Sequence, residues 1–424
     1  MKGIKTIDSL YHACTYGRAP VVFERGRGAR LWNDKGRDYI DFGSGIGVMS
    51  LGYANPAWGI FSDEVRKMVS AVLGRSSPSI LEFTFGTEER TVPQAAVLPH
   101  TSNLFYNEKT AMLAGRLALR THFERVFLSN SGAEANECLI KTARKWASDT
   151  KGEGEHPFVT LVNSFHGRTL PPVTATGQDT FHKFFGPFTP GFRYVPAGDL
   201  AALERQLDAE DCSAVLVEIV QGEGGVRALD ADYLKAVEAL CHEKNVLFCV
   251  DEVQTGNGRT GTWFAYEQFG LSPDLVSTAK GLGNGLPIGA TLMGPKTAEV
   301  LTPGTHGSTF GGNPVACAGA LSVLEQIDDA FLEAVKQKGA WLTAELEKIP
   351  GVKDVSGLGL MLGFSVEGCK SADIKAKALD NGLVVLTAKD RVRLLPPLAI
   401  TEEELSDGLL RLAAAIREVQ EAAH

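Results

Sequence analysis

The middle of the chain alternates short apolar segments with amphipathic segments of helical length. Continuously apolar strands are typical of a sheet covered on both faces, and helices are the usual connections between parallel strands. Helical spacing is present in EANECLIKTARKWASD (134–149) and in DADYLKAVEALCHEK (230–244). The sequence therefore predicts an α/β fold with a mostly parallel sheet. The predicted strands are residues 125–130, 158–165, 213–220, 245–253 and 273–280.

The pattern changes near residue 310, which predicts a second, smaller α+β unit. A chain of 424 residues is longer than one core usually supports, so two domains are expected. The opening stretch RGARLWNDKGRDYIDFGSG predicts a hairpin with a turn at Asp34–Gly36, and we expect it to pack on the smaller unit. The expected organisation is an N-terminal segment (1–50), a large domain (51–310) and a C-terminal small domain (311–424).

Charge and cysteine usage narrow the class of protein. The net charge of −9 argues against a nucleic-acid partner or an anionic membrane surface, because both favour basic patches. The seven cysteines are dispersed without a CxxC pair, which favours reduced thiols in the cytoplasm. The sequence shows neither the apolar core of a signal peptide nor a stretch long enough to span a bilayer. It also lacks HExxH or similar metal-ligand spacing, so we expect no metal site.

Each predicted strand ends in residues that are able to do chemistry. Open parallel sheets bind ligands at the carboxyl ends of their strands, so these residues are expected to share one edge and one site. The strand ends lead into SNSGAEAN (129–136), SFHGR (164–168), EIVQGEGG (218–225), DEVQTG (251–256) and Lys280.

The segment SNSGAEAN predicts a turn from a strand into a helix. Backbone N–H groups at a helix start, together with the helix dipole, can bind a phosphate. A plain helix cap by Ser129, Asn130 or Ser131 explains the same residues. The segment is not a P-loop, and GSGIGV (43–48) does not match the dinucleotide pattern GxGxxG because it ends in valine.

Asp251 ends the apolar segment NVLFCVD, so its carboxylate emerges from a buried strand. A buried anion needs a cationic or hydrogen-bonding partner, which a protonated heterocycle, a backbone cap or an arginine would provide. Glu252 follows along the strand and should point to the opposite face, where a structural role is expected.

Lys280 ends another apolar segment and precedes glycines 281, 283 and 285. A solvated lysine is the simplest interpretation. STAK also matches the SxxK pattern of serine acyl-enzymes, but the companion motifs SDN and KTG are absent. The third interpretation is a lysine that condenses with a carbonyl group, which requires a lowered pKa so that the amine is neutral. The glycines would then let a bulky ring approach the backbone.

Two arginines are candidates for binding carboxylates. Arg168 and Arg393 carry planar guanidinium groups that bind carboxylates in a bidentate way, although a structural salt bridge is the alternative for each. His166 is a possible general base, but a positioning role is favoured because no serine or cysteine nucleophile is identifiable. A phosphate site, a buried carboxylate, a reactive amine and carboxylate-binding arginines together suit pyridoxal 5′-phosphate.

These motifs resemble those of the class III (subgroup II) pyridoxal-phosphate aminotransferases, nearly from end to end. The resemblance implies the fold type I architecture, with a seven-stranded-type sheet flanked by helices, and a homodimer with active sites at the subunit interface. It rests on TSNLFYN, NSGAEANE, FHGRT, TGQ, FGP, QGEGGV, DEVQTGNGRTG, PDLVSTAKGLGNGLPIGA, PGTHGSTFGGNP, GLGLMLG and RLLPPL.

The resemblance also implies roles for individual residues. Lys280 would bind the cofactor covalently and move the proton, Asp251 would hold the pyridine nitrogen protonated, and Arg168 would bind the α-carboxylate of the donor. Glu223 would pair with Arg393 until glutamate binds. The implied cofactor-binding set is Ser131, Gly132, Ala133, Phe165, Glu218, Asp251, Val253, Gln254 and Lys280, with Thr309 reaching the phosphate of the partner subunit.

The implied reaction is transfer of the ω-amino group of N2-acetyl-L-ornithine to 2-oxoglutarate. Ornithine, succinylornithine, 4-aminobutyrate or a lysine derivative are alternative donors, and an aminomutase or racemase of the same fold is the alternative reaction class.

The sequence departs from the family pattern at three places. LGYANP has Tyr53 where the family usually has histidine, and Ile219 replaces a proline. The stretch 57–98 is longer than usual and includes a predicted helix that begins at Ser62.

Overall fold

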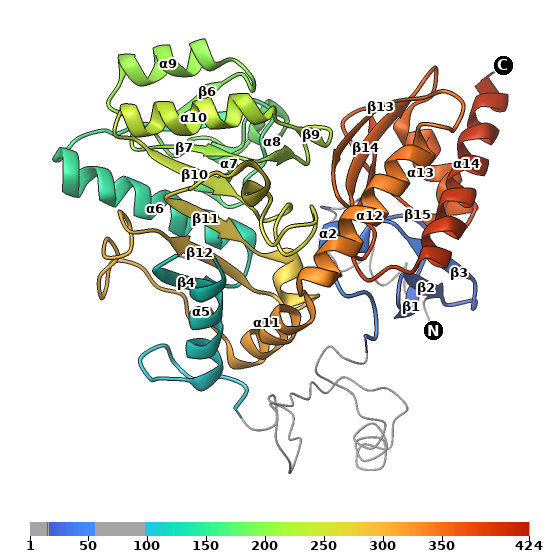
Figure 1. The fold of residues 1–424 in the computed structure, drawn as a ribbon, viewed down its shortest axis with the longest axis horizontal. Coiled ribbons are helices and arrows are strands. Elements are labelled where there is room, and N and C mark those ends of the chain that lie inside the picture. Colours follow the sequence, from blue (N-terminus) through green and yellow to red (C-terminus); the bar gives the residue numbers. More distant parts are fainter. Residues whose placement is uncertain (1–14, 16, 56–97, 122, 424) are drawn as a thin grey trace.

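The computed structural model describes residues 15, 17–55, 98–121 and 123–423 (Figure 1). The predicted helix after Ser62 and the long stretch 57–98 lie almost wholly outside these residues. Within the described part, no helix is both long and apolar enough to cross a membrane.

A seven-stranded sheet forms the centre of the larger unit (Figure 1). All five predicted strands are present in it, and every neighbouring pair is parallel except the two pairs that β12 makes. The prediction of a mostly parallel sheet is therefore confirmed. In spatial order the strands are β4 (Arg125–Ser129), β12 (Gly289–Met293), β11 (Leu275–Thr278), β10 (Leu247–Asp251), β7 (Ala214–Val217), β5 (Phe158–Leu161) and β6 (Phe192–Val195).

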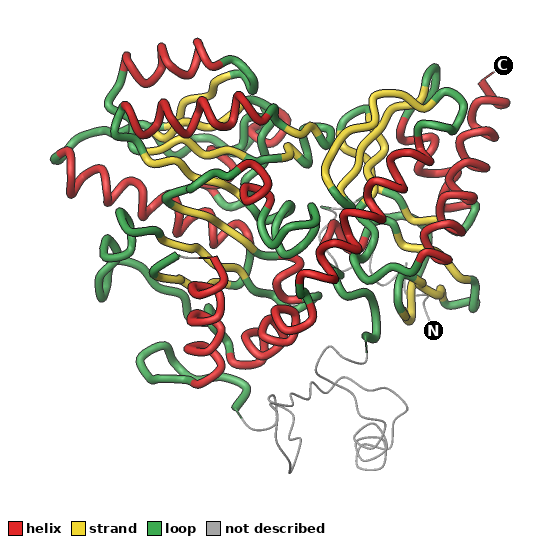
Figure 2. Tube along the Cα trace, in the orientation of Figure 1, coloured by secondary structure: helices red, strands yellow, loops and turns green. Residues whose placement is uncertain are grey.

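Alternate side chains of the strands pack into two different cores, because successive residues of a strand point to opposite faces. On β10, Phe248 and Val250 belong to one core, whereas Leu247 and Cys249 belong to the other. Figure 2 shows helices on both sides of this sheet. The first core is covered by α5 (Glu108–Thr121), α9 (Leu200–Ala209), α10 (Ala231–Glu243) and α11 (Pro314–Gln326), and the second by α6 (Gly132–Lys151) and α7 (Leu170–Ala175).

The smaller unit has its own core, to which both ends of the described chain contribute. The hairpin β2 (Arg30–Asn33) and β3 (Asp38–Asp41) forms a sheet with β1 (Phe23–Arg27), and β3 pairs in parallel with β15 (Leu383–Val384). The rest of the unit comprises α12 (Asp329–Leu346), β13 (Val352–Leu358), β14 (Met361–Val366), α13 (Ser371–Asp380), β16 (Leu386–Ala388), β17 (Arg391–Leu394) and α14 (Glu402–Ala423).

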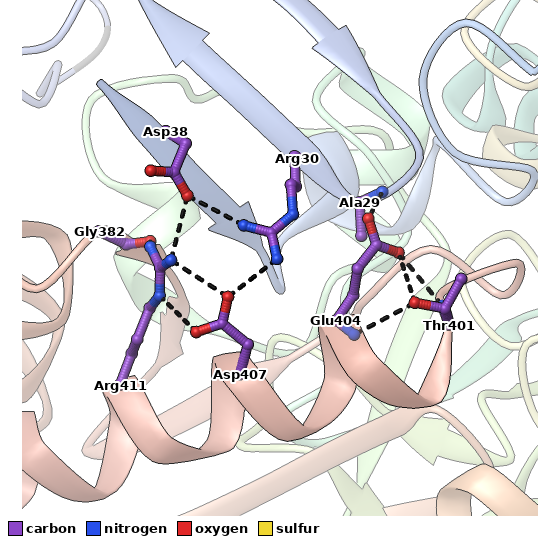
Figure 3. Close-up of polar contacts among 8 residues, drawn as sticks. All are labelled: Ala29, Arg30, Asp38, Gly382, Thr401, Glu404, Asp407 and Arg411. Carbon is purple, nitrogen blue, oxygen red and sulfur yellow. Dashed lines mark hydrogen bonds and ion pairs between the residues drawn. The ribbon is translucent and has the colours of Figure 1, made fainter. Parts of the chain in front are cut away.

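Four alternating charges fasten the N-terminal hairpin to α14 (Figure 3). Arg30 contacts Asp38 at 3.0 Å and Asp407 at 2.9 Å, and Arg411 contacts the same two carboxylates at 3.0 and 2.9 Å. All four side chains are partly exposed, so each ion pair on its own contributes at most about 1 kcal/mol. As a closed network, they fix the hairpin on the smaller unit.

Short elements complete the described fold. They are α2 (Ser44–Gly47), α8 (Asp179–His182), β8 (Val220–Gln221), β9 (Arg227–Ala228) and the 3₁₀ helices η1 (Ala265–Phe269) and η2 (Lys280–Gly283).

Candidate active site

The carboxyl ends of the parallel strands enclose a cavity of about 330 Å³. Because β4, β5, β7, β10 and β11 all run in the same direction, the segments that follow them meet at one edge of the sheet. The cavity is lined by nine residues singled out from the sequence, namely Ser131, Gly132, Ala133, Phe165, Glu218, Asp251, Val253, Gln254 and Lys280.

Asp251 is held by three donors at the end of β10. Its neighbours Leu247 and Cys249 face α6, so the alternation along the strand directs Asp251 to the same face. There, Asp251 Oδ2 accepts a hydrogen bond from Asn136 Nδ2 at 2.8 Å, and it forms a second hydrogen bond with His166 Nδ1 at 2.7 Å. The backbone N–H of Val253 donates to Asp251 Oδ1 at 3.0 Å. His166 thus contacts the carboxylate directly, which is the arrangement that the predicted positioning role requires.

Glu252 has the structural role expected of it. Its fully buried carboxylate accepts hydrogen bonds from the Thr255 hydroxyl at 2.5 Å and the Tyr266 amide at 2.9 Å, outside the cavity. Burial raises the pKa of Glu252 to about 7 despite these donors.

Lys280 follows β11 with a left-handed backbone (φ +46°) that projects its amine into the cavity. Burial lowers the pKa of the Lys280 amine to about 8, with a further lowering by the charge of Arg393. Among the described residues, the amine has no hydrogen-bond partner, and Lys280 lines the cavity. A solvated lysine does not fit this environment.

The glycines after Lys280 serve a different purpose from the one expected for two of them. A Cβ at Gly281 would lie 2.4 Å from Ser50 Oγ, and a Cβ at Gly283 would lie 2.8 Å from Ile288 Cγ2. These glycines allow close packing of the loop itself, whereas Gly285 (φ +106°) does line the cavity.

The start of α6 combines a helix cap with free backbone amides. Ser131 Oγ accepts a hydrogen bond from the Glu134 amide at 3.2 Å, and Glu134 Oε2 accepts one from the Asn130 amide at 2.5 Å. Within the described residues, the amides of Gly132 and Ala133 have no recorded acceptor. The cap explanation and the anion-site explanation therefore both apply to this turn.

Glu218 lies buried on the third strand end and accepts a hydrogen bond from the Phe165 amide at 3.2 Å. Burial, and then the nearby charge of Asp251, raise the pKa of Glu218 well above its ordinary value. The environment of the cavity therefore favours the protonated form of the Glu218 carboxyl.

Arg393 and Glu223 form a close pair next to the cavity. Arg393 Nη1 lies 2.5 Å from Glu223 Oε1 and 3.5 Å from Gln254 Oε1, and Gln254 also lines the cavity. The Arg393 side chain is almost fully buried, whereas that of Glu223 is one-quarter exposed. Glu223 also borders a second cavity, of about 730 Å³, so it has space into which it can move.

Two further predicted residues do not line this cavity. The Arg168 guanidinium stacks over the rings of Phe181 at 4.2 Å and Phe165 at 5.5 Å, and no carboxylate partner for it is recorded among the described residues. Thr309 is exposed and lies outside the cavity of its own chain.

Sequence reasoning missed a left-handed turn that contributes to the cavity wall. Ser44, Gly45, Ile46 and Gly47 have consecutive φ angles of 48°, 60°, 66° and 73°, and Val48 lines the cavity. A left-handed conformation costs about 1–2 kcal/mol per non-glycine residue, and Ile46 is β-branched. The adjacent glycines in GSGIGV were the signal that an unusual backbone was present. Asn136 was also missed, because its contact with Asp251 depends on how α6 faces the sheet.

Comparisons with known proteins agree with this site. The sequence model of the class III aminotransferase family matches residues 61–416 of this chain. The chain is 46% identical to an acetylornithine aminotransferase of Haemophilus ducreyi, across 98% of this chain and 99% of that protein. It is 41% identical to an acetylornithine aminotransferase of Bacillus subtilis, across 97% and 98%.

Solved structures give the same result. An ornithine aminotransferase from Toxoplasma gondii superposes with a TM-score of 0.87 at 34% identity, covering 99% of this chain and 95% of that one. An N-acetylornithine aminotransferase from Stenotrophomonas maltophilia superposes with a TM-score of 0.78 at 36% identity, covering 98% and 99%.

The fold and site thus define a transferase of fold type I. More particularly, the chain belongs to the class III aminotransferases, which depend on pyridoxal 5′-phosphate.

The residues present in the cavity fit this cofactor. Free amides at the start of α6 suit its phosphate, the carboxylate of Asp251 suits a protonated ring nitrogen, and Phe165 and Val253 provide apolar surface for the ring. When bound, pyridoxal 5′-phosphate supplies an aldehyde and an electron-withdrawing ring. Lys280 is the amine of the cavity that suits the aldehyde.

Proposed function

We propose that the enzyme transfers the ω-amino group of N2-acetyl-L-ornithine to 2-oxoglutarate, giving N-acetyl-L-glutamate 5-semialdehyde and L-glutamate. Arginine biosynthesis uses this reaction. The pair between Arg393 and Glu223 is the observation that carries the proposal, because one site must accept two different donors. Relatives that are 40–46% identical over nearly the whole chain, and are named acetylornithine aminotransferases, support the choice of donor.

Each residue in or near the cavity has a separate role in the proposed reaction. Arg168, whose guanidinium has no recorded carboxylate partner among the described residues, binds the α-carboxylate of each donor. Asp251, fixed by Asn136 and His166, holds a proton on the ring nitrogen of the cofactor. Lys280 Nζ, whose lowered pKa of about 8 makes the neutral amine more accessible, takes the proton from the carbon that bears the amino group.

Arg393 and Glu223 act as a switch between the two donors. While the ω-amine donor is bound, Glu223 neutralises Arg393, which would otherwise be a buried, unpaired charge. Glutamate brings a second carboxylate, which displaces Glu223 and binds Arg393. Glu223 then moves toward the adjacent cavity of about 730 Å³ that it already borders. The two half-reactions alternate in a ping-pong scheme.

A homodimer with shared active sites is part of the proposal. Leu104, Phe105, Tyr106 and Phe310 are exposed apolar side chains, and Asn103 Nδ2 links their two segments by donating to the Gly311 carbonyl at 2.8 Å. We call these four side chains the apolar patch, and exposed apolar side chains on two linked segments favour contact with another protein surface. Thr309 lies next to Phe310. A second copy that covers the apolar patch would therefore bring Thr309 close to the cofactor bound by that second copy. The six described cysteines are free thiols, which favours a cytoplasmic enzyme.

Half-reaction spectroscopy tests the donor and the switch in one experiment. Holoenzyme is mixed with N2-acetyl-L-ornithine, ornithine or glutamate, and loss of the cofactor's long-wavelength absorbance is followed. We expect acetylornithine to react at least tenfold more efficiently than ornithine. In Arg393→Ala, the rate of the glutamate half-reaction should fall at least a hundredfold, which corresponds to about 2.8 kcal/mol of activation free energy. The rate of the acetylornithine half-reaction should change less than tenfold, because only glutamate needs the second guanidinium.

Equal reactivity of acetylornithine and ornithine would remove the assignment of the donor. Equal losses in both half-reactions of Arg393→Ala would contradict the switch. The alternative reaction, an isomerisation, is recognised by turnover without 2-oxoglutarate and without formation of glutamate.

A further inference from the structure

The left-handed turn Ser44–Gly47 connects the two halves of the active site. On the side of the larger unit, the amide of Leu51 donates to Asn284 Oδ1 at 2.9 Å, within the loop that follows Lys280. On the side of the smaller unit, Phe42 and Ser50 accept hydrogen bonds from the amides of Leu395 and Leu398, both at 2.7 Å. Figure 1 shows this segment, labelled α2, between the two units.

The contacts of this segment bear directly on the reactive groups. Leu395 follows Arg393 by two residues, and Ser50 packs against the glycine that follows Lys280. Val48, directly after the turn, lines the cavity. A change in the backbone of the turn therefore moves one wall of the cavity relative to both Lys280 and Arg393.

The turn is held by one buried carboxylate. Asp41 is 1% exposed, and its Oδ1 accepts hydrogen bonds from the amides of Gly43 at 2.8 Å and Ser44 at 3.0 Å. Its Oδ2 accepts a hydrogen bond from the Tyr53 hydroxyl at 2.7 Å. These bonds hold the start of the turn, whereas the exposed side chain of Ile46 contributes little packing to stabilise its left-handed backbone.

We propose that Tyr53 is a positioning residue, whose hydroxyl holds Asp41 and through it the left-handed turn that aligns the Lys280 loop with the Arg393 strand. Tyr53 does not line the cavity. It acts through Asp41, because a buried carboxylate that loses a donor reorganises its remaining hydrogen bonds. This role rests on the class III assignment and not on the identity of the amine donor.

Two substitutions at position 53 separate the hydrogen bond from ring packing. A Cβ at Gly26 would lie 2.6 Å from Cγ of Tyr53, so the side chain also packs closely on that glycine. Tyr53→Phe keeps the ring and removes the donor. Tyr53→His reduces the ring and retains an N–H donor on the side chain. A role in packing and a role in hydrogen bonding therefore predict opposite orders of damage.

The test is steady-state kinetics of the holoenzymes with glutamate and with N2-acetyl-L-ornithine as separate donors. For Tyr53→Phe we expect KM to rise about tenfold and kcat to stay within twofold, because the hydroxyl positions binding walls without touching the reacting atoms. Tyr53→His should have a KM within threefold of the wild-type value. Tyr39→Phe is the matched control, since the Tyr39 hydroxyl accepts only a 3.5 Å hydrogen bond from Asn33 within the described residues.

Three results would overturn the proposal. They are a wild-type KM in Tyr53→Phe, a loss confined to kcat, or a Tyr53→His variant that is more impaired than Tyr53→Phe. If Tyr53→Phe does not fold, the KM of Tyr53→His is the test. A KM within threefold of the wild-type value supports the proposal, and a larger rise contradicts it. Failure of the acetylornithine assignment leaves the glutamate measurements, and hence this test, in place.

Discussion

Lys280 and Asp251 both line the cofactor cavity, and their surroundings act on the two side chains in different ways. Lys280 lies in a cavity where burial favours its neutral form, and the charge of Arg393 adds to this effect. Asp251 accepts three hydrogen bonds, which fix the position of its carboxylate. The reactive groups are therefore prepared before any substrate binds.

The lowered pKa of Lys280 predicts a pH dependence of stability in the apoenzyme. The pKa falls from 10.5 to about 8 on folding, so between these values the unfolded chain binds more protons than the folded chain. Stability should therefore rise with pH across this window, and the full penalty should be present below about pH 8. Lys280→Met removes the penalty, so its apoenzyme should melt at a higher temperature than wild type near neutral pH, with a difference that shrinks toward pH 10.5.

Thermal unfolding of both apoenzymes over this pH range measures the effect. The exposed Lys353, changed to methionine, serves as the control and should follow the wild-type profile. A constant difference between Lys280→Met and wild type across the window would contradict the prediction.

At the scale of elements, the start of α6 is packed tightly against the segment that follows β10. A Cβ at Gly132 would lie 2.6 Å from Cγ1 of Val253, and both residues line the cofactor cavity. Glycine is required there because the helix must begin close to that segment.

Gly132→Ala should therefore weaken cofactor binding at least tenfold, because the helix start and Val253 must separate. Titration of the apoenzyme with pyridoxal 5′-phosphate gives the dissociation constant. The matched control is Gly115→Ala in α5, where an added Cβ meets no atom within 4 Å. That variant should bind the cofactor normally and be more stable by about 0.5–1 kcal/mol. Unchanged cofactor affinity in Gly132→Ala would show that the contact is not essential.

Most of the large sheet could be predicted from the sequence, because its strands are buried on both faces and hence continuously apolar. Two strands of this sheet were not predicted. In β6, Arg193 and Tyr194 interrupt the apolar pattern, and β12 (GATLM) is short and begins with glycine. Lys280 and Asp251 could be found because each ends an apolar segment: Asp251 is the last residue of β10, and Lys280 lies two residues after β11. The handedness of the turn Ser44–Gly47 could not be predicted, because the tertiary contact between Asp41 and Tyr53 stabilises it.

At the scale of the whole molecule, a buried arginine joins the two units. Arg259 belongs to the loop after β10, yet its Nη1 donates to the carbonyls of Leu360 at 3.0 Å and Pro396 at 2.5 Å in the smaller unit. The side chain is 2% exposed, and burial lowers its pKa to about 9. No carboxylate partner is recorded for Arg259 in the described part of the chain, so its contribution is to satisfy carbonyls across the boundary.

Arg259→Met should lower the free energy of unfolding by about 1–3 kcal/mol, because two buried carbonyls lose their donor. It should also make the two units unfold in separate transitions. Calorimetry measures both effects, through the midpoint and through the ratio of van't Hoff to calorimetric enthalpy. The control Arg116→Met removes an exposed ion pair with Glu325 and should change stability by less than about 1 kcal/mol. Equal effects of the two substitutions would show that Arg259 does not couple the units.

The pairing of β3 with β15 has a consequence for biosynthesis. The ribosome releases β3 early, but its partner strand, Leu383–Val384, emerges only after the entire seven-stranded sheet has been translated. Until then, the edge of the hairpin carries unpaired backbone groups that invite aggregation. Translation therefore separates the first hairpin from its partner strand by nearly the whole length of the chain.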